Sequence, residues 1–155
     1  HDEISESETI QYYNNWNHVR IHHLANIPKY RQLTSLKEKL NIPEEEFKKC
    51  LDFLLEKKLL VLEGDHLTMG FKKLYIKKNS PVVNLAHINA RLQNIHNLKN
   101  AGVDSLNFGA NLTISEKNYK VFRNKLVLLL EELYTLVEED EPERMCSFVV
   151  DLMDS

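Results

Sequence analysis

The sequence predicts an α+β protein built from two small units, residues 9–80 and residues 81–155. Apolar residues recur at helical spacing along much of the chain, whereas two stretches of the second unit alternate with the period of a strand. Residues 9–80 hold 13 basic and 8 acidic side chains, and residues 81–155 hold 7 and 11, for net charges of +5 and −4. This division of charge indicates two units with different partners.

The composition of the chain excludes several classes of protein. Of its 155 residues, 43% are hydrophobic, the net charge is −3, and glycine and proline number four each. A disordered chain would be less apolar and more highly charged, and a collagen-like chain would hold far more glycine. The longest purely apolar run, residues 126–130, is much shorter than the roughly 20 residues of a membrane span. The polar start lacks the features of a signal peptide, so we predict a cytoplasmic protein that does not enter the membrane.

The first unit opens with a helix predicted over residues 9–26. An apolar face that includes Trp16 runs along it, and Pro28 ends the pattern. A short second helix follows, with Ser35 as its predicted N-cap. Residues 41–43 then form a predicted turn.

A third helix is predicted to start at Pro43, because proline is favoured at the first helical position. Three glutamates, Glu44–Glu46, follow and suit the positive end of the helix dipole. Apolar residues then recur at i, i+3, i+4, i+7 and i+8, which is the spacing of one buried face. They are Phe47, Cys50, Leu51, Leu54 and Leu55.

Two short apolar runs complete the first unit. Residues 59–63 and 66–69 flank Gly64 and Asp65, which predicts a β-hairpin with a tight turn from Glu63 to His66. Helix, short helix, turn, helix and hairpin is the order of elements in a winged helix-turn-helix.

The second unit reads as helix, strand, helix, strand. A fourth helix is predicted from Pro81 to about Gly102, and residues 105–114 alternate as a half-buried strand does. Ser115 is the predicted N-cap of a fifth helix that runs to about Glu139, and a last strand is predicted over residues 145–153.

The fifth helix is apolar on more than one face. Its main stripe comprises Tyr119, Phe122, Leu126, Leu129, Leu133 and Leu136. Such a helix must be covered on more than one side, and two strands alone make a marginal sheet. We therefore predict a homodimer through residues 81–155. The candidate interface residues are Leu126, Leu128, Leu130, Leu133, Val137, Phe148 and Val150.

No pattern in the sequence indicates a catalytic, metal or cofactor site. Cys50 and Cys146 could form a bridge, but their apolar surroundings favour buried free thiols. His18 and His22 lie one helical turn apart, as metal ligands can, but a third ligand at matching spacing is absent, which favours surface or packing histidines. Phosphate-binding glycine loops and nucleophile elbows are also absent from the sequence. We predict that the protein is not an enzyme.

The positive first unit indicates DNA as a partner. The outward face of the third helix carries Lys48 and Lys49 beside three acidic residues and lacks arginine, asparagine and glutamine, so it is better suited to phosphates than to bases. Four lysines that follow the hairpin either hold phosphates beside it or form a solvated edge that discourages strand aggregation. The candidate DNA contacts are Arg31, Lys37, Lys39, Lys48, Lys49, Gly64, His66, Lys72, Lys73, Lys77 and Lys78.

Two sets of residues carry a resemblance to a known bacterial family. The first set is Tyr13-x2-Trp16-x-His18-x2-Ile21-x2-Leu24, then Ile42-Pro43 and Leu54-Leu55-x3-Leu59-Leu60. The second set is Leu112-Thr113-Ile114-Ser115-Glu116, Phe122-Arg123 and the closing residues 144–152. Their order and spacing resemble the predicted winged-helix regulators abundant in Bdellovibrio and Fibrobacter, whose C-terminal part is a domain of unknown function. The resemblance covers residues 9–152 and implies a transcriptional regulator. An arginine usual ahead of the alternating strand and a closing Phe-Pro-Leu are missing here.

We therefore expect a dimeric DNA-binding transcriptional regulator with a winged-helix head. The alternative is a protein-interaction module that has lost DNA binding and uses Phe53, predicted to be exposed on the acidic face of the third helix. A role for residues 81–155 in sensing a small molecule is a third hypothesis, and the sequence names no ligand for it.

Overall fold

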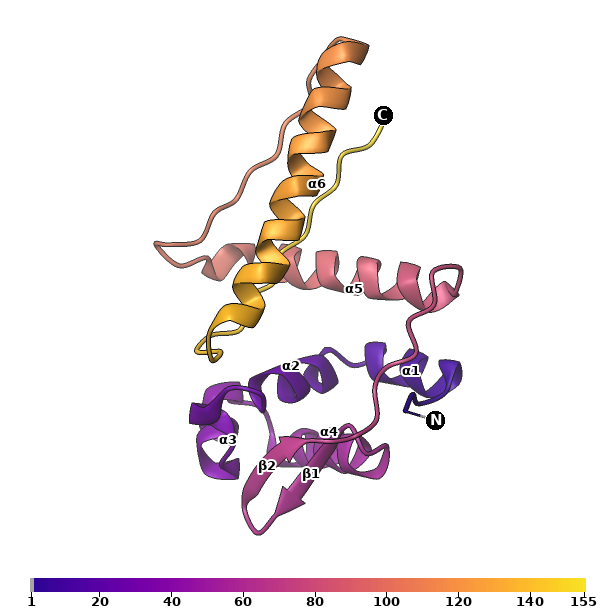
Figure 1. Ribbon diagram of the computed structural model, residues 1–155. Coiled ribbons are helices and arrows are strands. Elements are labelled where there is room, and N and C mark those ends of the chain that lie inside the picture. The colour runs from indigo at the N-terminus through magenta and orange to yellow at the C-terminus, as the bar shows by residue number, and fades with distance from the viewer. Residues whose placement is uncertain (1) are drawn as a thin grey trace. The chain divides into compact units, whose positions relative to one another are not determined.

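The computed structural model describes residues 2–155 and divides the chain into two compact units. The first runs to His96 and includes Pro142–Ser147, and the second comprises Asn97–Glu141 and Phe148–Ser155. The described residues form helices and one two-stranded antiparallel sheet, so the mixed α+β composition is confirmed (Figure 1).

The first unit begins with two helices, α1 (Glu6–Tyr13) and α2 (Trp16–Leu24), where the sequence predicted one. The break lies at Asn14 and Asn15. The side chain of Asn15 accepts a hydrogen bond from the backbone N–H of Asn17 at 2.9 Å and so caps α2. Asparagine favours such local hydrogen bonds over the helix interior, which explains the break.

A 3₁₀ turn, η1 (Pro28–Tyr30), leads to α3 (Leu33–Leu40) and α4 (Glu44–Glu56). The predicted cap of α3, Ser35, lies inside the helix instead, and Gln32 occupies the N-cap without a side-chain hydrogen bond. The first helical N–H, of Leu33, donates to the carbonyl of Asp65 at 3.0 Å. A backbone carbonyl of the hairpin therefore caps the N-terminus of α3, the role that was predicted for Ser35.

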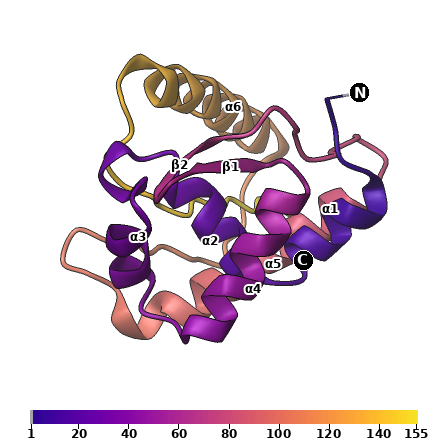
Figure 2. The same cartoon turned by 90° about the horizontal axis from the view of Figure 1, so that it is seen from below.

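The core of the first unit lies between α2, α3, α4 and the hairpin. α2 packs against α4, α1 and α3, and α4 also contacts strand β1 (Leu60–Glu63) (Figure 2). The fully buried large side chains come from every one of these elements and from α1. They include Tyr12, Ile21, Leu36, Leu54, Leu60 and Leu67.

Strand β1 pairs with β2 (His66–Met69) in the register Leu60↔Met69 to Glu63↔His66, which confirms the predicted hairpin. Gly64 in the turn has φ +67°, a left-handed conformation that favours glycine. Gly70, directly after β2, approaches the end of α4 closely. A Cβ atom there would lie 2.0 Å from the carbonyl oxygen of Lys58, so only glycine fits.

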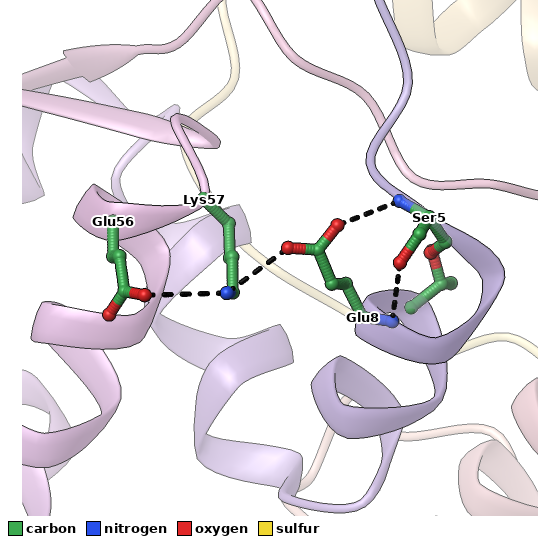
Figure 3. A network of polar contacts seen from close by, with 5 residues as sticks. Ser5, Glu8, Glu56 and Lys57 are labelled. Carbon is green, nitrogen blue, oxygen red and sulfur yellow. Dashed lines mark hydrogen bonds and ion pairs between the residues drawn. The ribbon is translucent and has the colours of Figure 1, made fainter.

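The N-terminus of the first unit is held by a capping box and an ion pair, shown in Figure 3. Ser5 Oγ accepts from the backbone N–H of Glu8, and the Glu8 carboxylate accepts from the N–H of Ser5. Lys57, after the end of α4, lies 3.1 Å from the same carboxylate and 3.4 Å from that of Glu56. The Ser5 backbone N–H and then Lys57 lower the pKa of Glu8 to about 2.

The segment after the hairpin runs back along the N-terminal residues. The N–H of Ile4 donates to Lys73 O at 2.8 Å, and the N–H of Tyr75 donates to Thr9 Oγ1 at 2.9 Å. Ser80 Oγ then donates to Glu6 at 2.8 Å. The first unit ends in α5 (Pro81–Asn97), of which Val82 alone among its described side chains is buried.

The second unit contains η2 (Leu98–Asn100) and α6 (Glu116–Glu139). Ser115 Oγ accepts from the N–H of Asn118 at 3.2 Å, so the predicted cap and length of this helix are confirmed. The predicted strands over 105–114 and 145–153 are wrong, because neither segment has strand pairing in the structure. Alternation identifies an apolar face, but a strand also needs a neighbouring strand for its backbone groups.

The two cysteines have different environments. Cys50 in α4 is buried and Cys146 is exposed, and both are free. The prediction of buried free thiols is therefore confirmed for Cys50 and wrong for the burial of Cys146. Its predicted strand, which would have buried it, is not formed.

Candidate nucleic-acid interface

The candidate interface is formed by α3, α4 and the hairpin of the first unit. Asn41, with φ 51°, ends α3 in a left-handed conformation and donates its N–H to Lys37 O at 3.0 Å. α4 then begins at Glu44, one residue after the predicted Pro43. Lys37 Nζ lies 2.8 Å from the Glu44 carboxylate across the turn. Both side chains are exposed, so this ion pair contributes little to stability.

The N-terminal end of α4 is tied to the start of α2. The Glu46 carboxylate accepts from Asn15 Nδ2 at 2.7 Å and from Asn17 Nδ2 at 3.4 Å. These amide donors, Asn15 first, lower the pKa of Glu46 below its ordinary value. Glu46 is therefore a fixed negative charge, and Glu44 and Glu45 beside it are exposed. A phosphate would meet unfavourable charge at this end of the helix.

The outward face of α4 carries charges of both signs. Phe47, Cys50, Leu51 and Leu54 are buried, as predicted. The exposed residues of the opposite face are Glu45, Lys48, Lys49, Asp52 and Glu56. The two lysines can contact phosphates, while the acidic residues among them limit the approach of other parts of a duplex.

The hairpin is joined to the segment that precedes α3. The N–H of Leu67 donates to Arg31 O at 2.8 Å, and His66 forms an isolated antiparallel bridge with Gln32. Gly64 and His66 are exposed at or beside the turn. The sequence predicted the helices, the turn and the hairpin of this region but not the bridge. A single bridging residue has no recognisable sequence pattern.

The basic residues around α3 lie near the same elements. Arg31 is half-buried, and its guanidinium donates to Asn26 O at 3.3 Å. Lys39 is exposed, with Nζ 5.9 Å from the centre of the Tyr30 ring. Lys37 is held by Glu44, as described above. Lys39 is therefore the more accessible cation of α3.

The lysines at 72, 73, 77 and 78 lie on the connector beside the N-terminal segment and α1, not beside the hairpin turn. Backbone hydrogen bonds join Lys73 to Asp2 and Ile4, and Lys72 N–H donates to Lys58 O at 3.1 Å. Lys77 and Lys78 are exposed further along the same connector. These four lysines therefore belong to a different element of the first unit from Lys48 and Lys49 of α4.

Phe53 is half-buried, so its predicted exposure is wrong. Its ring stacks on that of His18, with ring centres 4.3 Å apart and planes at 17°. The two rings lie in an open depression of about 430 Å³. Its lining residues are Gln11, His18, Lys49, Asp52, Phe53, Glu56 and Lys57. The sequence placed Phe53 on the outward face of α4 but contained no sign that α2 supplies a ring to cover it.

The histidines of α2 take part in packing, as the sequence favoured. His18 is buried, and its Nδ1 lies 3.0 Å from Tyr12 O. His22 Nδ1 lies 2.9 Å from the Tyr12 hydroxyl. Burial and then the nearby His23 lower the pKa of His22 to about 4, so its ring is neutral at pH 7. Within residues 2–155, no group of three or more potential ligands is arranged to hold a metal ion.

A family model described as a domain of unknown function, DUF4423, matches residues 1–153. The chain belongs to the DUF4423 family. The DUF4423 match covers both structural units, so the two units belong to one family domain. No curated protein and no solved structure matches the chain. Among the helices that the structure describes, none has the length and apolar character needed to cross a bilayer.

Proposed function

We propose that residues 16–70 of this DUF4423 protein form a winged helix-turn-helix that binds double-stranded DNA as part of a transcriptional regulator. The observation that carries the proposal is the bridge between Gln32 and His66, which attaches the hairpin to the start of α3. With this bridge the elements follow the order helix, bridge, helix, turn, helix and hairpin, which supports a winged helix-turn-helix. α4 would then be the helix that meets the duplex.

The charges of this head favour phosphate contacts over base contacts. Lys48 and Lys49 on α4 and Lys39 on α3 are exposed cations on the two helices of the motif. The outward face of α4 lacks the arginine, asparagine and glutamine that read base edges in the major groove. Binding should therefore depend strongly on salt and weakly on sequence.

A titration of a fluorescent genomic DNA duplex at 50 and 200 mM salt tests this proposal. The Lys48→Glu/Lys49→Glu variant should lose binding, because it removes two phosphate contacts and adds two repulsive charges. The matched control is Lys77→Glu/Lys78→Glu, which changes the net charge equally but lies on the connector beside α1. It should bind within about threefold of the wild type, because these two lysines are not on α4, and salt screens exposed charges that do not contact the duplex.

Two results would contradict DNA binding by this head. One is the absence of any binding at the lower salt concentration. The other is an equal loss in both charge variants, which would mean that net charge and not the α4 surface governs the interaction.

A second function, protein recognition, is favoured by the depression around Phe53. The stacked rings of Phe53 and His18 lie among its lining residues, and its charged residues are Asp52, Glu56, Lys49 and Lys57. An apolar side chain of a partner protein, flanked by charges of both signs, fits these features. Capture of a single partner that is lost on Asp52→Lys/Glu56→Lys, by a protein that fails to bind DNA, would support this second function over the first.

We also propose that the second half of the chain forms a homodimer. In its support, no described residue of 97–141 or 148–155 is buried, although α6 is rich in leucine. Phe148 and Val150, two of the predicted interface residues, are exposed in a segment that is neither helix nor strand. Light scattering that finds only monomer at high protein concentration would contradict this part of the proposal.

A further inference from the structure

The apolar stripe of α6, which comprises Tyr119, Phe122, Leu126, Leu129, Leu133 and Leu136, is only partly covered in the structure: Tyr119 and Leu126 are half-buried, and none of the six is fully buried. Its six residues alternate in spacing between three and four, which is the a and d pattern of a coiled coil over three heptads. Phe122, Leu129 and Leu136 are 48%, 54% and 57% exposed. A 24-residue helix with this pattern is suited to packing along a second helix.

The stripe has the same spacing in both directions from the midpoint between Val127 and Leu128. The mirrored pairs are Leu126 with Leu129, Phe122 with Leu133, and Tyr119 with Leu136. In an antiparallel pair of α6 helices, each layer would therefore match an a residue of one helix with a d residue of the other. This self-complementarity is what a twofold interface between identical chains requires, and a different partner protein would not require it.

The charges of α6 favour the same antiparallel direction. The N-terminal half carries Lys117, Lys120, Arg123 and Lys125 against one acidic residue, Glu116, and the C-terminal half carries Glu131, Glu132, Glu138 and Glu139. A parallel pair would align like charges, whereas an antiparallel pair aligns opposite ones. Lys125 and Glu132 both occupy g positions, which face each other across an antiparallel pair in this register.

We propose that α6 pairs with α6 of a second copy of this chain, antiparallel, with the twofold axis between Val127 and Leu128. In this arrangement Lys125 of each copy contacts Glu132 of the other. The inference rests on the homodimer part of the proposed function and is independent of DNA binding. It narrows the predicted interface: Leu126 and Leu133 lie in the stripe, Leu130 and Val137 border it, and Leu128 lies outside it.

A charge exchange in the full-length chain tests the direction and register of the pair. Lys125→Glu and Glu132→Lys should each weaken the dimer by about tenfold in sedimentation equilibrium, because each replaces two ion pairs per dimer with two repulsions. The double variant should return to the wild-type dissociation constant. Failure of the double variant to recover, or single variants without effect, would overturn the proposed register.

Two neighbouring leucines provide a second test with a matched control. Leu129→Glu should weaken the dimer by more than about 100-fold, because it buries two unpaired carboxylates in the stripe. Leu128→Glu, at a residue that is 64% exposed and outside the stripe, should leave the dimer within about threefold of the wild type. An equal effect of both changes would contradict the proposed face.

These outcomes separate the inference from the wider proposal. If the wild type is a dimer and no α6 variant changes its dissociation constant, the α6 pairing is overturned but the homodimer proposal is not. A wild-type monomer at all concentrations would overturn both. The DNA titration tests only residues 16–70, so its result decides neither the homodimer proposal nor the α6 pairing.

Discussion

The helices α4 and α6 show how differently two amphipathic helices can be used within one chain. α4 has 13 residues and four buried side chains, whereas α6 has 24 residues and none among those described. Both carry a regular apolar stripe and a first turn that begins with glutamate. The stripe therefore determines which face of a helix can be buried, while burial itself depends on the neighbouring elements.

The same contrast holds for the two units as a whole. All buried residues of the described chain lie between Ile4 and Val82, so the first unit contains the hydrophobic core. Cooperative unfolding should therefore report mainly on the first unit.

A leucine in each helix gives the largest contrast. Leu54 of α4 is fully buried, and Leu128 of α6 is 64% exposed. Leu54→Ala should lower the free energy of unfolding by about 3–4 kcal/mol through lost burial and a residual cavity. Leu128→Ala should change it by less than about 0.5 kcal/mol. Urea denaturation measures both, and comparable losses would contradict the assignment of the core to the first unit.

His22 gives an intermediate effect that depends on pH. Its pKa is lowered to about 4, from 6.5, chiefly by burial, so the unfolded chain binds a proton more readily than the folded one. The free energy of unfolding is therefore highest above about pH 6.5, and it decreases as the pH falls towards 4. The loss should amount to about 2–3 kcal/mol.

Urea denaturation between pH 7.5 and 4 measures this dependence. His22→Asn should remove most of it over that interval. His23→Asn, which removes only the smaller cause of the lowered pKa, should retain most of it. A wild-type protein of constant stability from pH 6.5 to 4 would contradict the burial of a neutral His22.

Two serine caps give the smallest contrast. Ser5 and Ser115 each accept a hydrogen bond from the N–H three residues ahead, at the start of α1 and of α6. Ser5→Ala should lower the free energy of unfolding by about 1 kcal/mol, because α1 is packed on the core. Ser115→Ala should leave the main transition unchanged. Equal shifts would mean that α6 unfolds together with the first unit.

The features predicted correctly from the sequence are those that neighbouring residues determine. The buried stripe of α4, the tight turn at Gly64 and the run of α6 from Ser115 to Glu139 all follow from local spacing and capping. The break at Asn15 is local too, but the aromatic and apolar pattern of residues 9–26 continues across it and obscures it.

The features that were missed depend on residues far apart in the chain. The strands at 105–114 and 145–153 lack a neighbouring strand. Phe53 is covered by His18, and the Lys73 backbone is paired with residues 2–4, 69 or more positions away. For the candidate interface, the sequence identified α4 and the turn, but the bridge from Gln32 to His66 required the structure.

The attachment of the hairpin has a consequence for recognition. At its base, the N–H of Gly70 donates to Leu59 O at 2.9 Å, and near its turn Asp65 O accepts from Leu33. Hydrogen bonds at both ends of the hairpin restrict it to one conformation and limit its adaptation to a target. If DNA binds here as proposed, it would meet a preformed surface, which would keep the entropic cost of association low and leave any deformation to the duplex.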